Sequence, residues 1–346
     1  MLTWSDIRAI DSIADPLGVL SVYVDRPDPA SGRLVRAVAL AGELRRLEQD
    51  IAQDGRPGLA TAYRDCLPRI RPALARMLDA RTPGRALFAP LSGDEVVEIG
   101  VGLPVGVTAA LERTAYVRPL VAAFDEGRPA GVMVAGVASA QLFEWRMGAV
   151  EEVGECRFAG SASHWRRDAG PLAAGLAREV RDISAARSWT RILVAGDTRL
   201  AHVLARGGAP GGCDVSMVSR PVEGLRPRGI AAVVGSDLHA AQRRYERGLV
   251  ERVVDAALSR RAAVLGAGRT LEALEGRRVG HLLFDGERDY RWSGALAEAG
   301  SGWPRRDPAE ALIELALHAG ADITPLEGES RTLLTESDGV AAVLRP

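Results

Sequence analysis

Hydrophobic residues along the chain follow two spacings, one typical of strands and the other of amphipathic helices. Short β-branched and apolar runs bounded by turn residues predict strands, as in Gly18 to Asp25, GVLSVYVD. Apolar residues spaced three and four apart predict a helix from Arg33 to Gln53. A second helix is expected from Leu59 to Asp79, interrupted by Pro68 and Pro72. Further strands are expected over residues 85–89, 95–101, 132–137, 141–146, 150–158, 191–195, 213–218, 263–265, 279–284, 322–325 and 340–344, and further helices over 172–186, 199–205, 238–258, 270–275 and 308–318.

The order of these elements divides the chain into three predicted domains. Residues 1–115 form an α/β N-terminal domain. Residues 116–225 begin with three strands on short connections, which indicates an antiparallel meander, and continue as helix, strand, helix, strand. By analogy with known folds, that order is expected of a ribonuclease-H-like sheet. After a linker at residues 220–229, residues 230–346 alternate helices with strands as an α/β sandwich does, so the predicted fold class is α/β (α+β).

Lys and Asn are absent from the 346 residues, so all 44 of the pooled Lys and Arg residues are Arg. This excludes Schiff-base and pyridoxal-phosphate lysines, the phosphate-binding lysine of P-loops and the kinase lysine. It also excludes N-glycosylation, which needs Asn. Any side-chain cation that recognises phosphate must therefore be Arg, which favours planar, two-pronged contacts.

The overall charge, the cysteines and the distribution of apolar residues limit which partners, bound groups and cellular location we expect for the protein. Net charge is -1 and the pI about 6.6, so contact with nucleic acid must come from local patches. The cysteines Cys66, Cys156 and Cys213 are far apart, which favours neither a zinc site nor a disulfide framework, and we expect no metal or cofactor. The charged N-terminal stretch and the lack of a long apolar window predict a cytoplasmic protein without membrane partners.

The loop at residues 159–171 has the most informative composition. It combines small residues with an aromatic residue and paired arginines, and such side chains can stack on bases and bind phosphate in RNA. The alternative is an ordinary loop whose Trp165 packs back on the sheet. His164 is the candidate catalytic residue of this loop. The candidate RNA- or ribosome-binding residues are Gly160, Ser161, Ser163, Trp165, Arg166 and Arg167.

The helix expected over residues 238–258 has a dense arginine face. Arg243, Arg244 and Arg247 are the candidates for binding a partner or RNA. Acidic residues interrupt the run and can pair with arginines at i,i+4 spacing, so a solvated, salt-bridged face is the alternative. These acidic residues are Glu246, Glu251 and Asp255.

Two enzyme classes have weaker signals. A ribonuclease-H-like sheet can carry a two-metal nuclease, for which Asp125, Glu144 and Asp197 are candidates, but their spread forms no recognisable signature. The stretch Gly266-Ala267-Gly268 lacks the third glycine of a dinucleotide fingerprint and predicts a plain turn.

Several stretches together carry a family resemblance. They are GVLSVYVD from Gly18; RPLV from Arg118, FDEGRPAGVMV from Phe124 and AQLFEW from Ala140; and, near the C-terminus, residues 266–274, RVGHLLFD from Arg278, residues 309–320 and DGVAAVLR from Asp338. In these stretches the chain resembles the bacterial branch of the archaeo-eukaryotic peptide-chain release factor and Pelota family. The resemblance extends over the whole length and is clearest in the C-terminal part.

The resemblance implies a three-domain factor that enters the ribosomal A site. Its third domain is then an α/β/α sandwich similar to kink-turn-binding ribosomal proteins and contacts a translational GTPase. Its middle domain reaches the peptidyl-transferase centre. The implied partners are the ribosome or tRNA, not DNA, and the implied roles are hibernation or rescue.

Two departures from the family pattern bear on activity. Catalytic members carry Gly-Gly-Gln in the loop between the third strand of the middle domain and the helix that follows it, whereas residues 160–170 contain no Gln. The eukaryotic codon-reading motif needs Asn and Lys, which the chain lacks. The sequence therefore predicts an A-site-binding factor without codon reading. The alternatives are a peptidyl-tRNA hydrolase that uses His164 in an atypical loop, and a non-ribosomal regulatory or interaction protein on the same scaffold.

Overall fold

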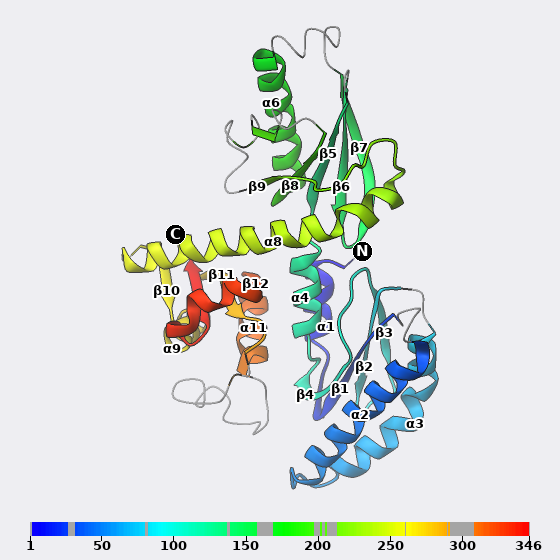
Figure 1. Ribbon diagram of the computed structural model, residues 1–346. Coiled ribbons are helices and arrows are strands. Elements are labelled where there is room, and N and C mark those ends of the chain that lie inside the picture. The colour runs from blue at the N-terminus through cyan, green and yellow to red at the C-terminus, as the bar shows by residue number, and fades with distance from the viewer. Residues whose placement is uncertain are drawn as a thin grey trace. The chain divides into compact units, whose positions relative to one another are not determined.

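The computed structural model describes residues 2–26, 32–79, 82–136, 139–157, 169–196, 201–202, 205, 213–259, 261–288, 290 and 308–345. These residues form helices and three β-sheets, one sheet within each predicted domain range (Figure 1). The predicted mixed α/β class is therefore confirmed. The chain divides into two compact units: unit 1 contains Met1–Asp125, Val253–Leu326 and Leu334–Pro346, and unit 2 contains Glu126–Arg252 and Glu327–Leu333.

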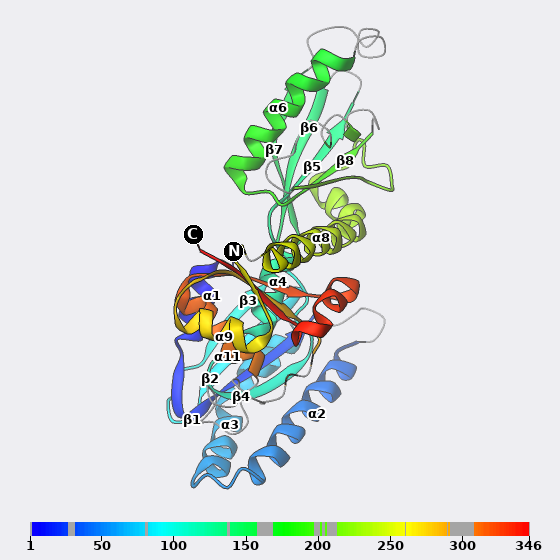
Figure 2. The same cartoon turned by 90° about the vertical axis from the view of Figure 1, so that its left-hand side faces the viewer.

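The N-terminal sheet of unit 1 is antiparallel, with strand order β3-β2-β1-β4. Two helices pack against each other and against this sheet (Figure 2). Apolar side chains of β1 and β2, such as Leu20 and Leu87, lie buried with Tyr63 and Ile70 of the second helix. The elements are β1 (Ala14–Asp25), α2 (Gly32–Ala52), α3 (Leu59–Leu78), β2 (Gly84–Pro90), β3 (Val97–Val101) and β4 (Thr108–Thr114).

Helix α3 continues through both of its prolines, so the predicted interruption is wrong. Pro68 and Pro72 lie one turn apart on the exposed side, whereas Tyr63, Cys66 and Ile70 are buried. A proline removes a backbone hydrogen bond, and on the exposed side water can satisfy the carbonyl that loses its donor. The buried apolar face of α3 therefore holds the helix together across the two prolines.

The C-terminal sheet of unit 1 has strand order β10-β13-β11-β12. Strands β11 and β12 are parallel, and the other neighbours are antiparallel. Helices α9 and α11 contact this sheet and each other. The elements are β10 (Ala263–Leu265), α9 (Ala267–Glu275), β11 (Val279–Asp285), α11 (Pro308–Ala319), β12 (Asp322–Leu326), the 3-10 helix η2 (Gly328–Ser337) and β13 (Val340–Leu344).

Two helices that were not predicted, α1 (Trp4–Asp11) and α4 (Arg118–Glu126), contribute to unit 1. The rings of Trp4 and Phe124 lie 4.4 Å apart between centroids. The buried carboxylate of Glu310 accepts hydrogen bonds from the backbone N–H groups of Val117 and Arg118, where α4 begins. These contacts tie α4 to α1 and to the first turn of α11.

The sheet of unit 2 has strand order β7-β6-β5-β8-β9. Strands β5, β6 and β7 are antiparallel, and β8 and β9 run parallel to β5. This is the ribonuclease-H-like order predicted from the sequence. The predicted helix over residues 199–205 lies largely outside the described residues. The elements are β5 (Ala130–Ala135), β6 (Ser139–Arg146), β7 (Ala149–Arg157), α6 (Ala169–Arg187), β8 (Arg191–Ala195) and β9 (Asp214–Met217).

The long helix α8 (Pro227–Leu258) begins at Pro227 and not at Leu238 as predicted. Proline suits the first turn of a helix because its missing N–H has no intrahelical acceptor there. Ile230, Val234 and Leu238 follow at i,i+4 spacing and are all buried. The Pro- and Arg-rich composition that indicated a linker therefore belongs in part to the start of α8. In the described part of the chain, no helix is long and apolar enough to cross a membrane.

The thiols of Cys66 and Cys213 should react slowly while the protein is folded. Burial raises the pKa of both thiols, and that of Cys213 to about 12. Relative to a thiol of pKa about 9, this lowers the thiolate fraction of Cys213 about a thousandfold at mildly alkaline pH. In a Cys156→Ser background, a thiol reagent should label little native protein and two thiols after denaturation in urea. Rapid native labelling at either position would contradict this prediction.

Candidate functional site

Most of the loop predicted at residues 159–171 lies outside the described residues, because residues 158–168 are not described. Residues 169–171 belong to α6, which begins at Ala169. The structure therefore does not place the candidate residues, which remain sequence predictions. They are His164 as the catalytic candidate and Gly160, Ser161, Ser163, Trp165, Arg166 and Arg167 as the RNA- or ribosome-binding candidates.

The elements on either side of this loop are well anchored in unit 2. Strand β7 is the edge strand of the sheet and pairs with β6 along its length. Helix α6 lies beside the sheet (Figure 1) and contributes Leu176 and Val180 to a core that includes Ile192, Val194 and Trp189. The loop thus connects an edge strand of the sheet to a helix that packs on the sheet.

Glu144 of β6 organises a polar cluster next to this core. Its Oε2 accepts a hydrogen bond from Trp189 Nε1 at 2.9 Å, and the carboxylate also pairs with Arg187 at 3.3 Å and Arg146 at 3.2 Å. The ring of Trp189 lies so close to Gly131 that a Cβ there would meet it at 2.4 Å. Glu144 thus fixes the indole over β5, a structural role in place of the nuclease role considered from the sequence.

The other two carboxylates that the sequence suggested for a nuclease site are Asp125 and Asp197. Asp125 is buried and accepts a hydrogen bond from Thr324 Oγ1 at 3.1 Å, and Asp197 lies outside the described residues. Among the residues with described positions, no three His, Cys, Asp or Glu side chains gather closely enough to hold a metal ion.

Arg191, at the start of β8, is fully buried. Its Nη2 donates to the carbonyl oxygens of Arg128 at 2.8 Å and Glu126 at 3.2 Å, and its Nη1 donates to that of Leu238 in α8 at 3.4 Å. The guanidinium lies 5.6 Å from the centroid of the Trp145 ring. Sequence reasoning missed this residue, because nothing in RILVA distinguishes a buried arginine from a solvated one.

Arg243 of α8, a predicted partner-binding residue, is paired within unit 2. Its guanidinium contacts Glu126, Glu246 at 3.0 Å and Glu327 at 3.0 Å. The side chain of Glu246 is fully buried and that of Arg243 is 21% exposed. Arg243 is therefore held by three carboxylates, two of which come from distant parts of the chain.

The other two predicted partner-binding arginines are paired less tightly. Arg244 contacts Asp214 of β9, with Nη2 at 3.1 Å and Nε at 3.3 Å from carboxylate oxygens. Arg247 pairs with Glu251 at 3.2 Å and with Glu329 at 3.5 Å. The i,i+4 pairing expected on this helix is confirmed for Arg247 and Glu251. No local pattern in the sequence predicts the pairs that these arginines of α8 form with Asp214, Glu327 and Glu329.

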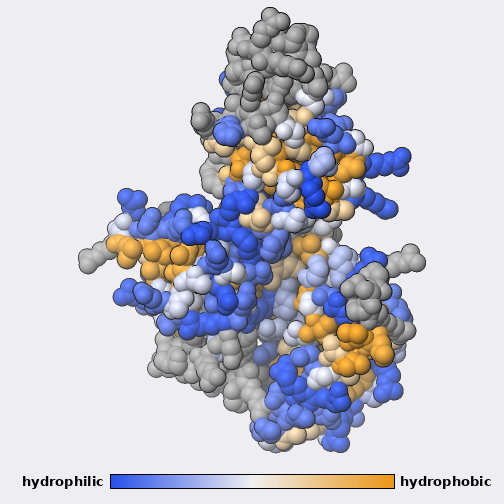
Figure 3. All heavy atoms as spheres, viewed as in Figure 1, coloured by the Kyte–Doolittle hydropathy of each residue, from blue (hydrophilic) through white to orange (hydrophobic). Residues whose placement is uncertain are grey.

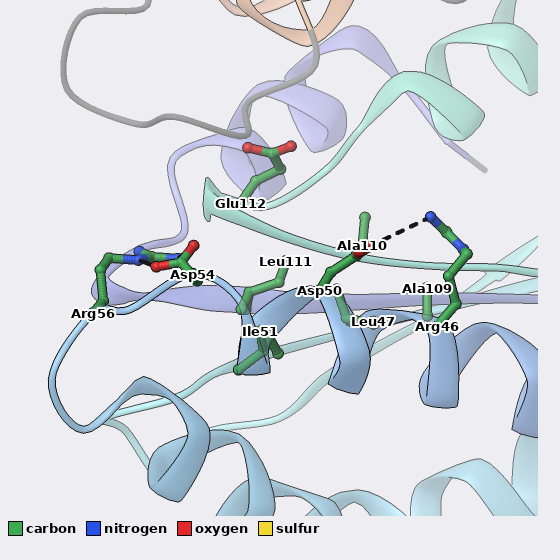
Figure 4. Close-up of a pocket in the computed structure, with 10 residues that line it drawn as sticks. All are labelled: Arg46, Leu47, Asp50, Ile51, Asp54, Arg56, Ala109, Ala110, Leu111 and Glu112. Carbon is green, nitrogen blue, oxygen red and sulfur yellow. Dashed lines mark hydrogen bonds and ion pairs between the residues drawn. The ribbon is translucent and has the colours of Figure 1, made fainter.

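A small groove lies between α2 and the edge strand β4 in unit 1 (Figure 4). Its floor includes Ile51 and Leu111, and ion pairs flank it: Arg46 with Asp50 at 3.9 Å and, from the loop after α2, Arg56 with Asp54 at 2.6 Å. Its volume of about 150 Å³ is below the range typical of sites for drug-sized ligands. This groove therefore does not indicate a nucleotide or cofactor site.

The middle region of the chain matches a known protein family. Residues 116–233 match the family described as bacterial archaeo-eukaryotic release factor family 10. The matched region contains β5 to β9, α6 and the undescribed loop between β7 and α6. The family resemblance inferred from the sequence is therefore confirmed over residues 116–233. No curated protein matches the chain significantly.

Solved structures of similar proteins match over most of the chain at low identity. Pelota of Archaeoglobus fulgidus is 17% identical over 75% of this chain and 79% of its own, with a TM-score of 0.37. Dom34 of Saccharomyces cerevisiae, described as a translation termination-like factor, is 11% identical over 75% and 78%, with a TM-score of 0.40. A model of ribosome-bound archaeal Pelota and ABCE1 gives 13% identity over 99% and 94%, with a TM-score of 0.43. At these TM-scores the likenesses support no inference about function.

Proposed function

We propose that this chain, whose residues 116–233 belong to the bacterial archaeo-eukaryotic release factor family, is a ribosome-associated translation factor. It acts in the cytoplasm by binding the ribosomal A site without reading a codon, in hibernation or rescue. The family match in the middle region is the observation that carries this proposal. The third domain contacts a translational GTPase in this view.

The composition of the loop between β7 and α6 supports binding over catalysis. The loop lacks the glutamine of catalytic family members and holds Trp165, Arg166 and Arg167. An indole can stack on an exposed base, and arginines can bind phosphate through two parallel hydrogen bonds. Because the net charge of the chain is only -1, the proposal assigns affinity for RNA to such local groups.

Purified protein should co-sediment with bacterial ribosomes at low salt, and a Trp165→Ala, Arg166→Ala, Arg167→Ala variant should bind at least about tenfold more weakly. The loss follows from removing one stacking surface and two phosphate contacts. The matched control is Arg178→Ala with Arg226→Ala, which removes the same charge from two exposed positions of unit 2. Failure of the unmodified protein to co-sediment, with or without a GTPase, would falsify the proposal.

We expect no release of labelled peptide from peptidyl-tRNA on the ribosome beyond the rate without factor. The reason is the missing glutamine, which in catalytic relatives places the attacking water. The measurement compares the protein with a His164→Ala variant in a peptide-release assay. Release that depends on His164 would contradict this expectation and support a peptidyl-tRNA hydrolase. If the protein neither releases peptide nor binds ribosomes, the scaffold serves a non-ribosomal regulatory role.

A further inference from the structure

We propose that Arg244 and Arg247 on α8 form a second RNA-phosphate-binding surface, which carboxylates of unit 2 cover when RNA is absent. Asp214 pairs with Arg244, and Glu251 and Glu329 pair with Arg247. Glu329 belongs to the segment Glu327–Leu333, which we call the strap. This inference rests on the proposed function for its choice of RNA as partner. Hydrophilic residues gather over much of α8 in the space-filling view (Figure 3).

The strap is fixed to α8 at one end by partly buried contacts. Glu327 pairs with Arg243 at 3.0 Å, and its backbone N–H donates to Glu246 at 3.4 Å. The hydroxyl of Ser330, a residue only 2% exposed, donates to the carbonyl oxygen of Arg243 at 3.2 Å. The backbone of the strap is therefore held on α8 independently of its most exposed carboxylate.

The outer contacts of the strap are weak. Glu329 reaches Arg247 at 3.5 Å, and the two side chains are 92% and 55% exposed. Pairs exposed to this degree contribute little to stability and often nothing measurable. A phosphate group can replace the carboxylate of Glu329 by a rotation of that side chain, while Ser330 keeps the strap in place.

The three arginines differ in how readily they can change partner. Arg243 is 21% exposed and is bound by three carboxylates, one of them fully buried, so it anchors the strap. Arg244 and Arg247 are 48% and 55% exposed, and their partners are carboxylates at the surface or close to it. Since the two lie three residues apart on α8, they project from neighbouring positions of the helix surface and can contact one phosphate backbone.

RNA fits this surface better than a general polyanion does. Arginine binds phosphate in a planar, two-pronged way, and Arg244 already contacts both carboxylate oxygens of Asp214 in a comparable geometry. Each arginine freed for phosphate should add about 0.7 to the magnitude of the log–log salt slope for single-stranded RNA. The strap thus limits affinity for RNA by competing for the guanidinium group of Arg247.

The test measures binding of a fluorescein-labelled oligouridylate by anisotropy at several salt concentrations, with the full-length protein. The strap variant Glu329→Gln, which removes the carboxylate that pairs with Arg247, should bind about two- to fivefold more tightly and with a steeper salt slope. Arg247→Ala in the same background should reverse most of the gain. Thermal melting of each variant should match that of the unmodified protein, because Glu329 and Arg247 are 92% and 55% exposed.

Glu272→Gln is the matched control for net charge. Glu272 is 78% exposed and pairs with Arg278 of unit 1 at 3.6 Å, so its loss frees no arginine of α8. Unchanged affinity of the strap variant, an equal gain from Glu272→Gln, or a gain that survives Arg247→Ala overturns the inference. Equal binding of polyglutamate by the strap variant overturns the choice of RNA.

The results separate this inference from the proposed function. If the protein co-sediments with ribosomes but the strap variant binds oligouridylate no more tightly, only the inference of a second RNA-binding surface is overturned. If the strap variant binds oligouridylate more tightly but the protein does not co-sediment with ribosomes, the second RNA-binding surface is supported and the ribosomal role is overturned. If neither is observed, both proposals fail.

Discussion

Replacing Arg191 by Met should lower the free energy of unfolding of unit 2 by about 3–5 kcal/mol. Three backbone carbonyls, those of Glu126, Arg128 and Leu238, accept from this one buried guanidinium. A buried carbonyl that loses its donor costs about 1–3 kcal/mol. Relief from burying the arginine charge offsets part of that loss, and this offset keeps the expected total below the sum of three such costs.

Arg191→Lys separates charge from geometry at the same position. Lysine keeps the positive charge, but its single ammonium group cannot reproduce a planar fork that reaches three carbonyls. We expect Arg191→Lys to destabilise unit 2 by about 2 kcal/mol, less than Arg191→Met. Equal effects of the two variants would show that charge at this position contributes nothing.

Denaturation in urea, followed together with hydrogen exchange of the amides in β5 and β8, measures these effects. Hydrogen exchange is needed because the chain has two units and denaturation of the whole chain can deviate from two-state behaviour. The control is Arg178→Met in α6, an exposed position at which we expect a change within about 0.5 kcal/mol. A change below about 1 kcal/mol for Arg191→Met would rule out the anchoring role.

The sequence was sufficient where hydrophobic spacing alone determines an element. Helix α2 and strand β8 follow from the spacing of apolar residues, whereas the ribonuclease-H-like sheet of unit 2 was expected by analogy with known folds. Strand β4 was missed, because its sequence TAALERT has few large apolar residues and includes Glu112, which is nonetheless buried. Helix α1 was missed because it has only eight residues, and its capping box between Thr3 and Asp6 is a weak signal in one sequence.

The polar contacts of the candidate site could not be predicted because their partners are distant in the sequence. Arg243 meets Glu126 and Glu327, which lie more than 80 residues away on either side. The spacing of the arginines on α8 is the same whether their guanidinium groups are free or paired, because only the tertiary structure decides which carboxylates reach them. The i,i+4 pair of Arg247 and Glu251 was predictable because helix geometry alone brings it together.

Replacing Glu310 should have the second large effect, in unit 1. Its carboxylate is 1% exposed and accepts from the N–H groups of Val117 and Arg118 at the first turn of α4. These N–H groups have no acceptor within the helix, and the positive end of the helix dipole favours the negative charge. We expect Glu310→Ala to destabilise unit 1 by about 3–4 kcal/mol, since one buried and one partly buried donor lose a charged acceptor.

Glu310→Gln distinguishes the charge from the hydrogen bonds. The amide oxygen can accept from one N–H group, but the amide nitrogen would face the other donor, so we expect a loss of about 2 kcal/mol. Burial, and next the charge of Glu310, raise the pKa of Tyr23 well above its usual value. Removing the charge should therefore let Tyr23 ionise at lower pH than in the unmodified protein, while burial still keeps its pKa high.

Hydrogen exchange of the α4 amides and an ultraviolet titration of tyrosine ionisation measure the two consequences separately. A protein with a neutral residue at position 310 should exchange the amides of Val117 and Arg118 faster, and the fold of unit 2 should stay protected. Glu272→Ala, which removes an exposed carboxylate of the same unit, should change stability by no more than about 0.5 kcal/mol. If Glu310→Gln leaves both exchange at α4 and tyrosine ionisation unchanged, Glu310 neither caps α4 nor acts electrostatically on Tyr23. In that case α4 would be held in unit 1 by its apolar contacts, such as the one between Trp4 and Phe124.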